Sequence, residues 1–198
     1  DPTCGSGAFL FAAMDVLEEI YEVTIRRASE ILEEGADSSD GALRRIVDDM
    51  SRHPSPKYFL LKTIVLENIY GVDIMAEAVE IARLRLFLSL VGRLRHRSEI
   101  EPLPDLDMNI KVGNILVGCS TFENAEETFS GNLLASASLE SLRPKAKKLV
   151  DVYNKFVEVQ RVSTSGSKLQ KAKANLVDLS NEIREELDEL YAIETGIA

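Results

Sequence analysis

The chain has 198 residues, and its 33 acidic and 23 basic side chains give a formal net charge of −10. This balance lacks the basic footprint that DNA-binding proteins usually show. Two cysteines are too few for a disulfide framework, and neither a signal peptide nor an apolar run of roughly 20 residues marks secretion or a membrane span. We expect one cytoplasmic domain with a hydrophobic core plus an appendage, and no membrane partner.

The first ten residues, DPTCGSGAFL, combine an acidic residue, a glycine-rich turn and an apolar run. This order is typical of the point where a parallel strand ends and a helix begins, and open α/β sheets bind ligands there. Gly5 and Gly7 can adopt positive φ and let the backbone approach a ligand closely. The strand that would lead into Asp1 is not in the sequence, so we expect the chain to be a fragment of a larger protein.

Phosphate-binding loops do not fit this turn. A P-loop requires Gly-Lys-Ser/Thr, whereas Ala8 and Phe9 follow Gly7. A dinucleotide-binding turn requires a third glycine at the position of Leu10. The carboxylate of Asp1 would repel a pyrophosphate and suits a ligand with a cationic amino group, such as S-adenosylmethionine (SAM).

Apolar residues at helical spacing predict three helices after the turn, at 12–34, 42–52 and 57–66. Turn-forming residues at 35–41 and a His-Pro-Ser-Pro run at 53–56 separate them. The usual interval between a glycine turn and the acid of the next strand is about 20 residues. We therefore expect a helical insertion over about 16–66.

Two further strands are predicted. Residues 68–74 read as a buried strand that ends at Asp73, where one carboxylate can accept both hydroxyls of a ribose, and 75–90 read as the following helix. Residues 108–112 alternate between apolar and polar, which indicates a strand ending at Gly113 and Asn114. An Asn side chain offers a donor and an acceptor, as the edge of an adenine ring requires.

The segments DPTCGSGAFL, NIYGVDIMAEAVEIARLRLFLSL and LPDLDMNIKVGNIL resemble motifs I, II and III of amino-methylating DNA methyltransferases. The resemblance is closest to the adenine-specific (N6) DNA methyltransferases of restriction-modification and phage-defence systems. It implies SAM as cofactor and DNA as the partner of the full-length enzyme. The fold expected is α/β, a partial Rossmann-like SAM-dependent methyltransferase sheet with a helical insertion and a C-terminal helical hairpin.

The resemblance also implies which residues bind the cofactor. The turn would hold the methionine end of SAM, Asp73 the ribose, Ile74 and Leu116 the adenine ring, and Asn114 its amino group. Phe9 would line the cofactor pocket. Core packing is the alternative for Phe9 and Leu116, and capping of a turn is the alternative for Asn114. The complete predicted set is Asp1, Pro2, Thr3, Cys4, Gly5, Gly7, Asp73, Ile74, Asn114 and Leu116.

Catalytic and metal-binding roles are not assigned to any residue. Cys4 lies within a glycine turn and is expected to be a small packing residue rather than a nucleophile. The cysteines and histidines lack the close spacing of zinc ligands. The family's Asn-Pro-Pro-Tyr loop, which binds the flipped-out base, has no counterpart, because no Pro-Pro pair occurs in the sequence. We expect these residues alone to be inactive, and the missing recognition domain to explain the negative charge.

Beyond residue 120 the sequence no longer shows the strand patterns of the first part. We expect the partial methyltransferase domain at 1–120, a loop at 121–138 and a helical hairpin at 139–198, whose two amphipathic arms flank a Ser/Gly-rich turn at 163–167. The apolar seam of the hairpin would pack within itself and against the domain or a protein partner. Two alternatives stay open: a non-catalytic assembly module on a methyltransferase-like scaffold, and a methyltransferase acting on protein or RNA.

Overall fold

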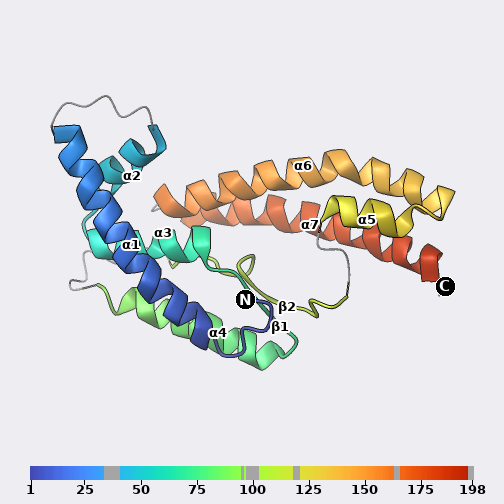
Figure 1. Ribbon diagram of the computed structural model, residues 1–198, viewed down its shortest axis with the longest axis horizontal. Helices are drawn as coiled ribbons and strands as arrows, with labels where there is room; N and C mark the ends of the chain where they lie inside the picture. The colour runs from blue at the N-terminus through green and yellow to red at the C-terminus, as the bar shows by residue number, and fades with distance from the viewer. Residues whose placement is uncertain (34–40, 95, 97–102, 118–120, 163–165, 196–198) are drawn as a thin grey trace. The chain divides into compact units, whose positions relative to one another are not determined.

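A computed structural model describes residues 1–33, 41–94, 96, 103–117, 121–162 and 166–195 (Figure 1). The chain divides into two compact units, Asp1–Ile115 and Leu116–Ala198. Helices make up most of the described residues in both units. No described helix combines the length and the apolar composition needed to cross a membrane.

The first unit is built around a buried helix. Its helices are α1 (Ala8–Glu33), α2 (Gly41–Arg52), α3 (Pro56–Asn68) and α4 (Ala76–Val91). Every residue of α3 from Tyr58 to Leu66 is buried, because α1, α2 and α4 all pack against it. A helix that is apolar on all sides is expected in such a central position. The helices predicted at 12–34, 42–52, 57–66 and 75–90 are confirmed, with α1 beginning four residues earlier.

The sheet of the first unit is small. Strands β1 (Gly71–Asp73) and β2 (Ile110–Val112) pair in parallel, with Gly71 opposite Ile110 and Asp73 opposite Val112. Within the described residues these two strands form the whole sheet, so the predicted Rossmann-like α/β fold is wrong. Strands in globular proteins are usually about five or six residues long. Here β1 is shorter because α3 continues to Asn68 and takes up the start of the predicted strand.

The predicted alternation over 108–112 also fails in part. Asn109 and Ile110 are both buried, whereas Val112 is 53% exposed. Successive side chains of a strand point to opposite faces, so two consecutive buried residues show that both faces are covered where β2 begins. The exposed Val112 shows that the strand leaves the core as it ends.

The described residues of the second unit form three helices: α5 (Phe122–Phe129), α6 (Leu133–Val162) and α7 (Gly166–Thr195). Helices α6 and α7 pack side by side as an antiparallel hairpin, drawn in orange and red in Figure 1. The amphipathic helices predicted on either side of the Ser/Gly-rich segment are therefore confirmed. Residues 163–165 of that segment lie outside the described residues.

The loop predicted at 121–138 is wrong, because α5 and the first turns of α6 occupy it. Two caps begin these helices: Thr121 Oγ1 accepts the N–H of Asn124 at 3.1 Å, and Asn132 Oδ1 accepts the N–H of Ala135 at 3.3 Å. The ring of Phe129 is fully buried and meets that of Tyr191 edge-on, with centroids 5.3 Å apart. Burial against α7 thus stabilises a helix of only eight residues, whose apolar side chains lie at helical spacing.

Candidate functional site

Asp73 joins three segments at the end of β1. Its Oδ2 accepts the N–H of Gly5 at 2.8 Å, and its Oδ1 accepts the N–H of Met75 at 2.9 Å. Its main-chain carbonyl accepts the N–H of Gly113 at 2.9 Å. The glycine turn, the start of α4 and the end of β2 therefore meet at one acidic residue, although the sequence separates them widely.

The carboxylate of Asp73 is held in its ionised form. Hydrogen bonds from the N–H groups of Met75 and Gly5 are the main causes that lower its pKa from the ordinary value of 3.8; partial desolvation opposes them, and the main chain of Ile74 adds a smaller lowering. An ionised carboxylate can accept about four hydrogen bonds. The side chain of Asp73 can therefore accept hydroxyl donors in addition to the main-chain groups it already holds.

The glycine turn runs along the edge of β1. The main-chain nitrogen of Asp1 donates to the Tyr70 carbonyl at 2.8 Å, and the Val72 N–H donates to the Asp1 carbonyl at 2.9 Å. The Cys4 N–H then donates to the Val72 carbonyl, also at 2.9 Å. The Asp1 side chain accepts the Thr3 N–H at 3.0 Å and so closes the beginning of the turn.

The two glycines of the turn differ in what surrounds them. Both have positive φ, +52° at Gly5 and +89° at Gly7. A Cβ at Gly7 would lie 3.3 Å from the Cβ of Ala82 on α4, whereas a Cβ at Gly5 would meet no atom within 4 Å. Gly7 thus permits close approach of the turn to α4, and Gly5 leaves open space beside the main chain, which a ligand can approach.

The side chain of Cys4 packs at the base of the turn. It is buried, and a Cβ on Gly71 would lie 3.0 Å from its Sγ, so it fills the space between the turn and β1. Burial, and secondly the charge of Asp73, raise the pKa of the Cys4 thiol. A buried thiol with a raised pKa is a poor nucleophile, which agrees with the packing role predicted for Cys4.

The apolar residues predicted near the ligand are exposed. Phe9 is 78% exposed, Ile74 is 70% exposed and Leu116 is 88% exposed. Core packing, the alternative for Phe9 and Leu116, is therefore wrong. Asn114 is exposed and directly follows Gly113, so it lies beside the end of β1. Leu116 is the first residue of the second unit, and its contact with a ring stays a prediction.

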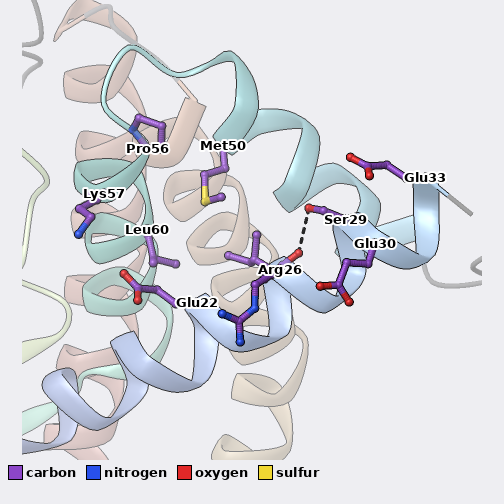
Figure 2. A pocket seen from close by; sticks show the side chains of 10 residues that line it. Glu22, Arg26, Ser29, Glu30, Glu33, Met50, Pro56, Lys57 and Leu60 are labelled. Atoms are coloured by element: carbon purple, nitrogen blue, oxygen red, sulfur yellow. Dashed lines mark hydrogen bonds between the residues drawn. The ribbon is translucent and has the colours of Figure 1, made fainter.

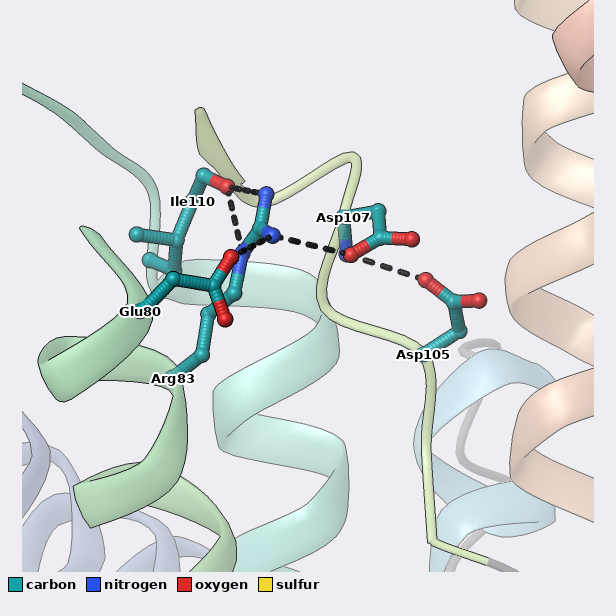
Figure 3. Close-up of polar contacts among 5 residues, drawn as sticks. All are labelled: Glu80, Arg83, Asp105, Asp107 and Ile110. Atoms are coloured by element: carbon teal, nitrogen blue, oxygen red, sulfur yellow. Dashed lines mark hydrogen bonds and ion pairs between the residues drawn. The ribbon is translucent and has the colours of Figure 1, made fainter. Parts of the chain in front are cut away.

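Two arginines of α4 hold the site, and sequence reasoning missed both. Arg85 donates to the Ser6 carbonyl at 2.8 Å and lies over the ring of Phe11, 4.5 Å from its centroid. Arg83 donates twice to the Ile110 carbonyl, at 2.5 and 3.0 Å, and pairs with Asp107 at 3.1 Å (Figure 3). Arg85 thus fixes the glycine turn and Arg83 fixes the start of β2. In the sequence they were two charged residues of a predicted helix rich in Ala, Leu, Ile and Arg, with no pattern that indicated a role.

Asn109 was also missed, because it was assigned to the polar face of a strand. Its buried Nδ2 lies 3.0–3.2 Å from the carbonyls of Val65, Leu66 and Ile69, at the end of α3. Its own carbonyl accepts the N–H of Gly71 at 2.9 Å. Asn109 therefore satisfies carbonyls left without partners where α3 ends, and it joins α3 to both strands.

A separate pocket of about 440 Å³ lies between α1, α2 and α3 (Figure 2). Ile25 and Leu60 form an apolar floor, and charged side chains such as Arg26 and Glu30 surround it. None of the predicted cofactor-binding residues lines it. A carboxylate with spare acceptor capacity beside an open glycine is chemically more specific, so we take the end of β1 as the candidate site.

Residues 67–192 match the family model described as Eco57I restriction-modification methylase. The chain belongs to this family. The match begins before β1, includes Asp73 and Asn114, and continues almost to the end of α7. The matched region includes most of the helical hairpin, and the predicted resemblance is confirmed at the level of the family.

A protein of Methanocaldococcus jannaschii described as a putative type II restriction enzyme and methyltransferase is 36% identical over 122 residues. The aligned stretch covers 60% of this chain and 8% of that relative, so the chain spans only a small part of its length. No solved structure matches the chain.

Proposed function

We propose that this chain binds SAM at the end of β1 and is the cofactor-binding part of an adenine-specific (N6) DNA methyltransferase of the restriction-modification type. The observation that carries the proposal is the Asp73 carboxylate, which holds the glycine turn and keeps acceptor capacity beside the open space at Gly5. Membership of the restriction-modification methylase family supports DNA as the substrate of the whole protein. Adenine as the target base rests on the resemblance of the three motifs.

The residues of the site fit the parts of SAM. The remaining lone pairs of Asp73 would accept the two ribose hydroxyls, and the exposed Ile74 would contact the adenine ring. The Asp1 carboxylate would lie near the cationic amino group, with the turn from Pro2 to Gly7 around the methionine end. Asn114 would bind the adenine amino group and Leu116 would lie beside the ring. SAM itself supplies an electrophilic methyl group for transfer.

These residues alone are proposed to bind the cofactor without transferring its methyl group. An adenine amino nitrogen must be freed from its base pair and held before it can attack, which requires a base-binding loop. No Pro-Pro pair, and hence no Asn-Pro-Pro-Tyr loop, occurs in the sequence. We also propose a cytoplasmic location, where the DNA of a cell that uses restriction and modification lies.

Calorimetric titration with SAM tests the proposal, with a matched pair of variants. Asp73→Asn removes one of the two carboxylate oxygens. Asp105→Asn makes the same change at an acid whose Oδ1 likewise accepts the N–H two residues ahead, at 2.9 Å. Hydrogen bonds to a charged group are strong, so Asp73→Asn should weaken binding about tenfold or more, and Asp105→Asn should leave it unchanged.

Two results would contradict the proposal. Equal loss in both variants would show that any acid-to-amide change loosens the unit, and no heat of binding to the wild-type chain would remove SAM as its ligand. Incubation with labelled SAM and duplex DNA tests the second part. Incorporation of label by the 198-residue chain would show that the base-binding loop is dispensable.

A further inference from the structure

The charges of the helical hairpin are divided along its length. We call residues 147–162 and 166–177, at the end where α6 finishes and α7 begins, the basic half. It carries seven Lys and Arg against two acids, Asp151 and Glu158. The rest of α7, from residue 178 to 195, carries seven acids and one basic residue, Arg184. A chain with a net charge of −10 therefore concentrates positive charge at one end of a hairpin.

Ion pairs neutralise cations at the other end of the hairpin. Arg143 pairs with Glu126 of α5. Lys145 pairs with Glu182 at 2.6 Å and also with Glu186 on α7, and these hydrogen bonds raise its pKa. These cations serve contacts within the second unit, where α5, α6 and α7 meet.

Five of the seven cations of the basic half are exposed, whereas Arg161 and Lys173 are half-buried. Lys147, Lys148, Lys155, Lys168 and Lys171 are all exposed, on both helices. At 1.5 Å per residue, the 16 residues of α6 in this half extend about 24 Å. That length is comparable with one helical turn of duplex DNA, about 34 Å.

Helix stability does not explain this arrangement. A helix favours acids in its first turn and cations in its last turn, because of its macrodipole. In α7 the first turn contains Lys168 and no acid, and the last turn contains Glu194 and no cation. The charges of α7 therefore oppose its own dipole, and an external partner is the better reason for them.

We propose that the basic half of the hairpin binds the phosphate backbone of duplex DNA, without reading its sequence. The inference rests on the proposed function, in which DNA is the substrate, and it adds a binding surface separate from the cofactor site. Flexible lysines that project from two helices suit phosphate contacts, since phosphates carry charge and no sequence information. The acidic residues 178–195 of α7 would be repelled by DNA, so the charge division would direct the basic half toward the duplex.

The test compares two triple variants of the full chain with equal change in net charge. The first is Lys155→Gln, Lys168→Gln and Lys171→Gln in the basic half. The control is Arg44→Gln, Arg45→Gln and Lys57→Gln, three exposed residues of the first unit. Fluorescence anisotropy measures the affinity for a labelled duplex of random sequence over a series of salt concentrations, and circular dichroism checks that each variant is folded.

The basic-half variant should bind about tenfold or more weakly at moderate salt. The slope of log K against log salt should fall by about 2 to 3, roughly one for each phosphate that the variant leaves without a lysine. The control should bind like the wild type. Equal weakening in both variants, unchanged binding in the first, or no duplex binding by the wild-type chain at low salt would overturn the proposal. Competition by poly-glutamate as effective as that by unlabelled DNA would assign the surface to an acidic polypeptide and would also overturn it.

Calorimetry with SAM on the same samples separates this inference from the proposed function. A basic-half variant that no longer binds DNA but still binds SAM supports both. A wild-type chain that binds DNA through the basic half but does not bind SAM would contradict the cofactor proposal alone. A wild-type chain that binds SAM but does not bind DNA would contradict the hairpin proposal alone.

Discussion

Each of the two units is stabilised by a different kind of internal contact. In the second unit, apolar residues that recur every three or four positions face one another across α6 and α7 and bury Phe129 of α5. In the first unit, the site is joined by hydrogen bonds between residues 68 positions apart, Asp73 and Gly5, and 79 positions apart, Arg85 and Ser6. The first kind of order is periodic along the chain, whereas the second depends on single polar side chains.

The largest expected effect is in the core of the second unit. Phe129→Ala removes a fully buried ring and should lower the free energy of unfolding of this unit by about 3–5 kcal/mol. Val150→Ala, at an exposed position of α6, should change it by less than about 0.5 kcal/mol. Urea denaturation gives the size of the effect. Hydrogen exchange should rise in the second unit while the first keeps its protection, and faster exchange in both would show that they unfold together.

Asn109→Ala should have the largest effect among the polar contacts of the first unit. It leaves buried carbonyls at the end of α3 without their donor, at a cost of about 1–3 kcal/mol. Asn114→Ala, at an exposed residue after the same strand, should cost less than about 0.5 kcal/mol. Thermal unfolding compares the two variants. Equal effects would mean that Asn109 does not hold α3 to the sheet.

The two glycines of the turn should differ in a predictable order. Gly5→Ala introduces a side chain at positive φ without a clash and should cost about 1–2 kcal/mol. Gly7→Ala adds crowding against Ala82 to the same strain, so its free energy of unfolding should fall further. Urea denaturation of both variants measures the order. The reverse order would show that the space beside Gly5 is filled rather than open.

The smallest effect expected is a pH dependence at Asp73. Its pKa is lower in the folded chain than the ordinary value of 3.8, so the stability it contributes is present above that value. This stability is lost as the pH falls through the lowered, folded pKa. The difference in unfolding midpoint between the wild type and Asp73→Asn should therefore be larger at neutral pH than at about pH 3. A difference that does not change with pH would show that the charge of Asp73 is irrelevant to the turn.

Prediction from the sequence succeeded where one element carries its own pattern. The helices of both units follow apolar spacing, and the three motifs identified the family. Prediction failed where contacts with residues distant in the sequence decide the local structure. Residues 122–129 place Phe122, Ala125 and Phe129 at helical spacing over only two turns, and the packing of Phe129 against Tyr191 stabilises this short helix. Asn109 was predicted to lie on the polar face of a strand. It is buried instead, because its side-chain amide donates to main-chain carbonyls at the end of α3.

The sequence by itself determined that an acid ends the strand at Asp73, that glycines form the turn at the start of the chain, and that two long amphipathic helices lie near its end. Only the tertiary structure decided that the Asp73 carboxylate holds Gly5, that two arginines of α4 fix the turn and β2, and that the sheet is limited to two short strands within the described residues. The reason is physical. Helical periodicity is written into neighbouring residues, whereas a hydrogen bond between distant segments exists only once packing has brought its donor and acceptor together.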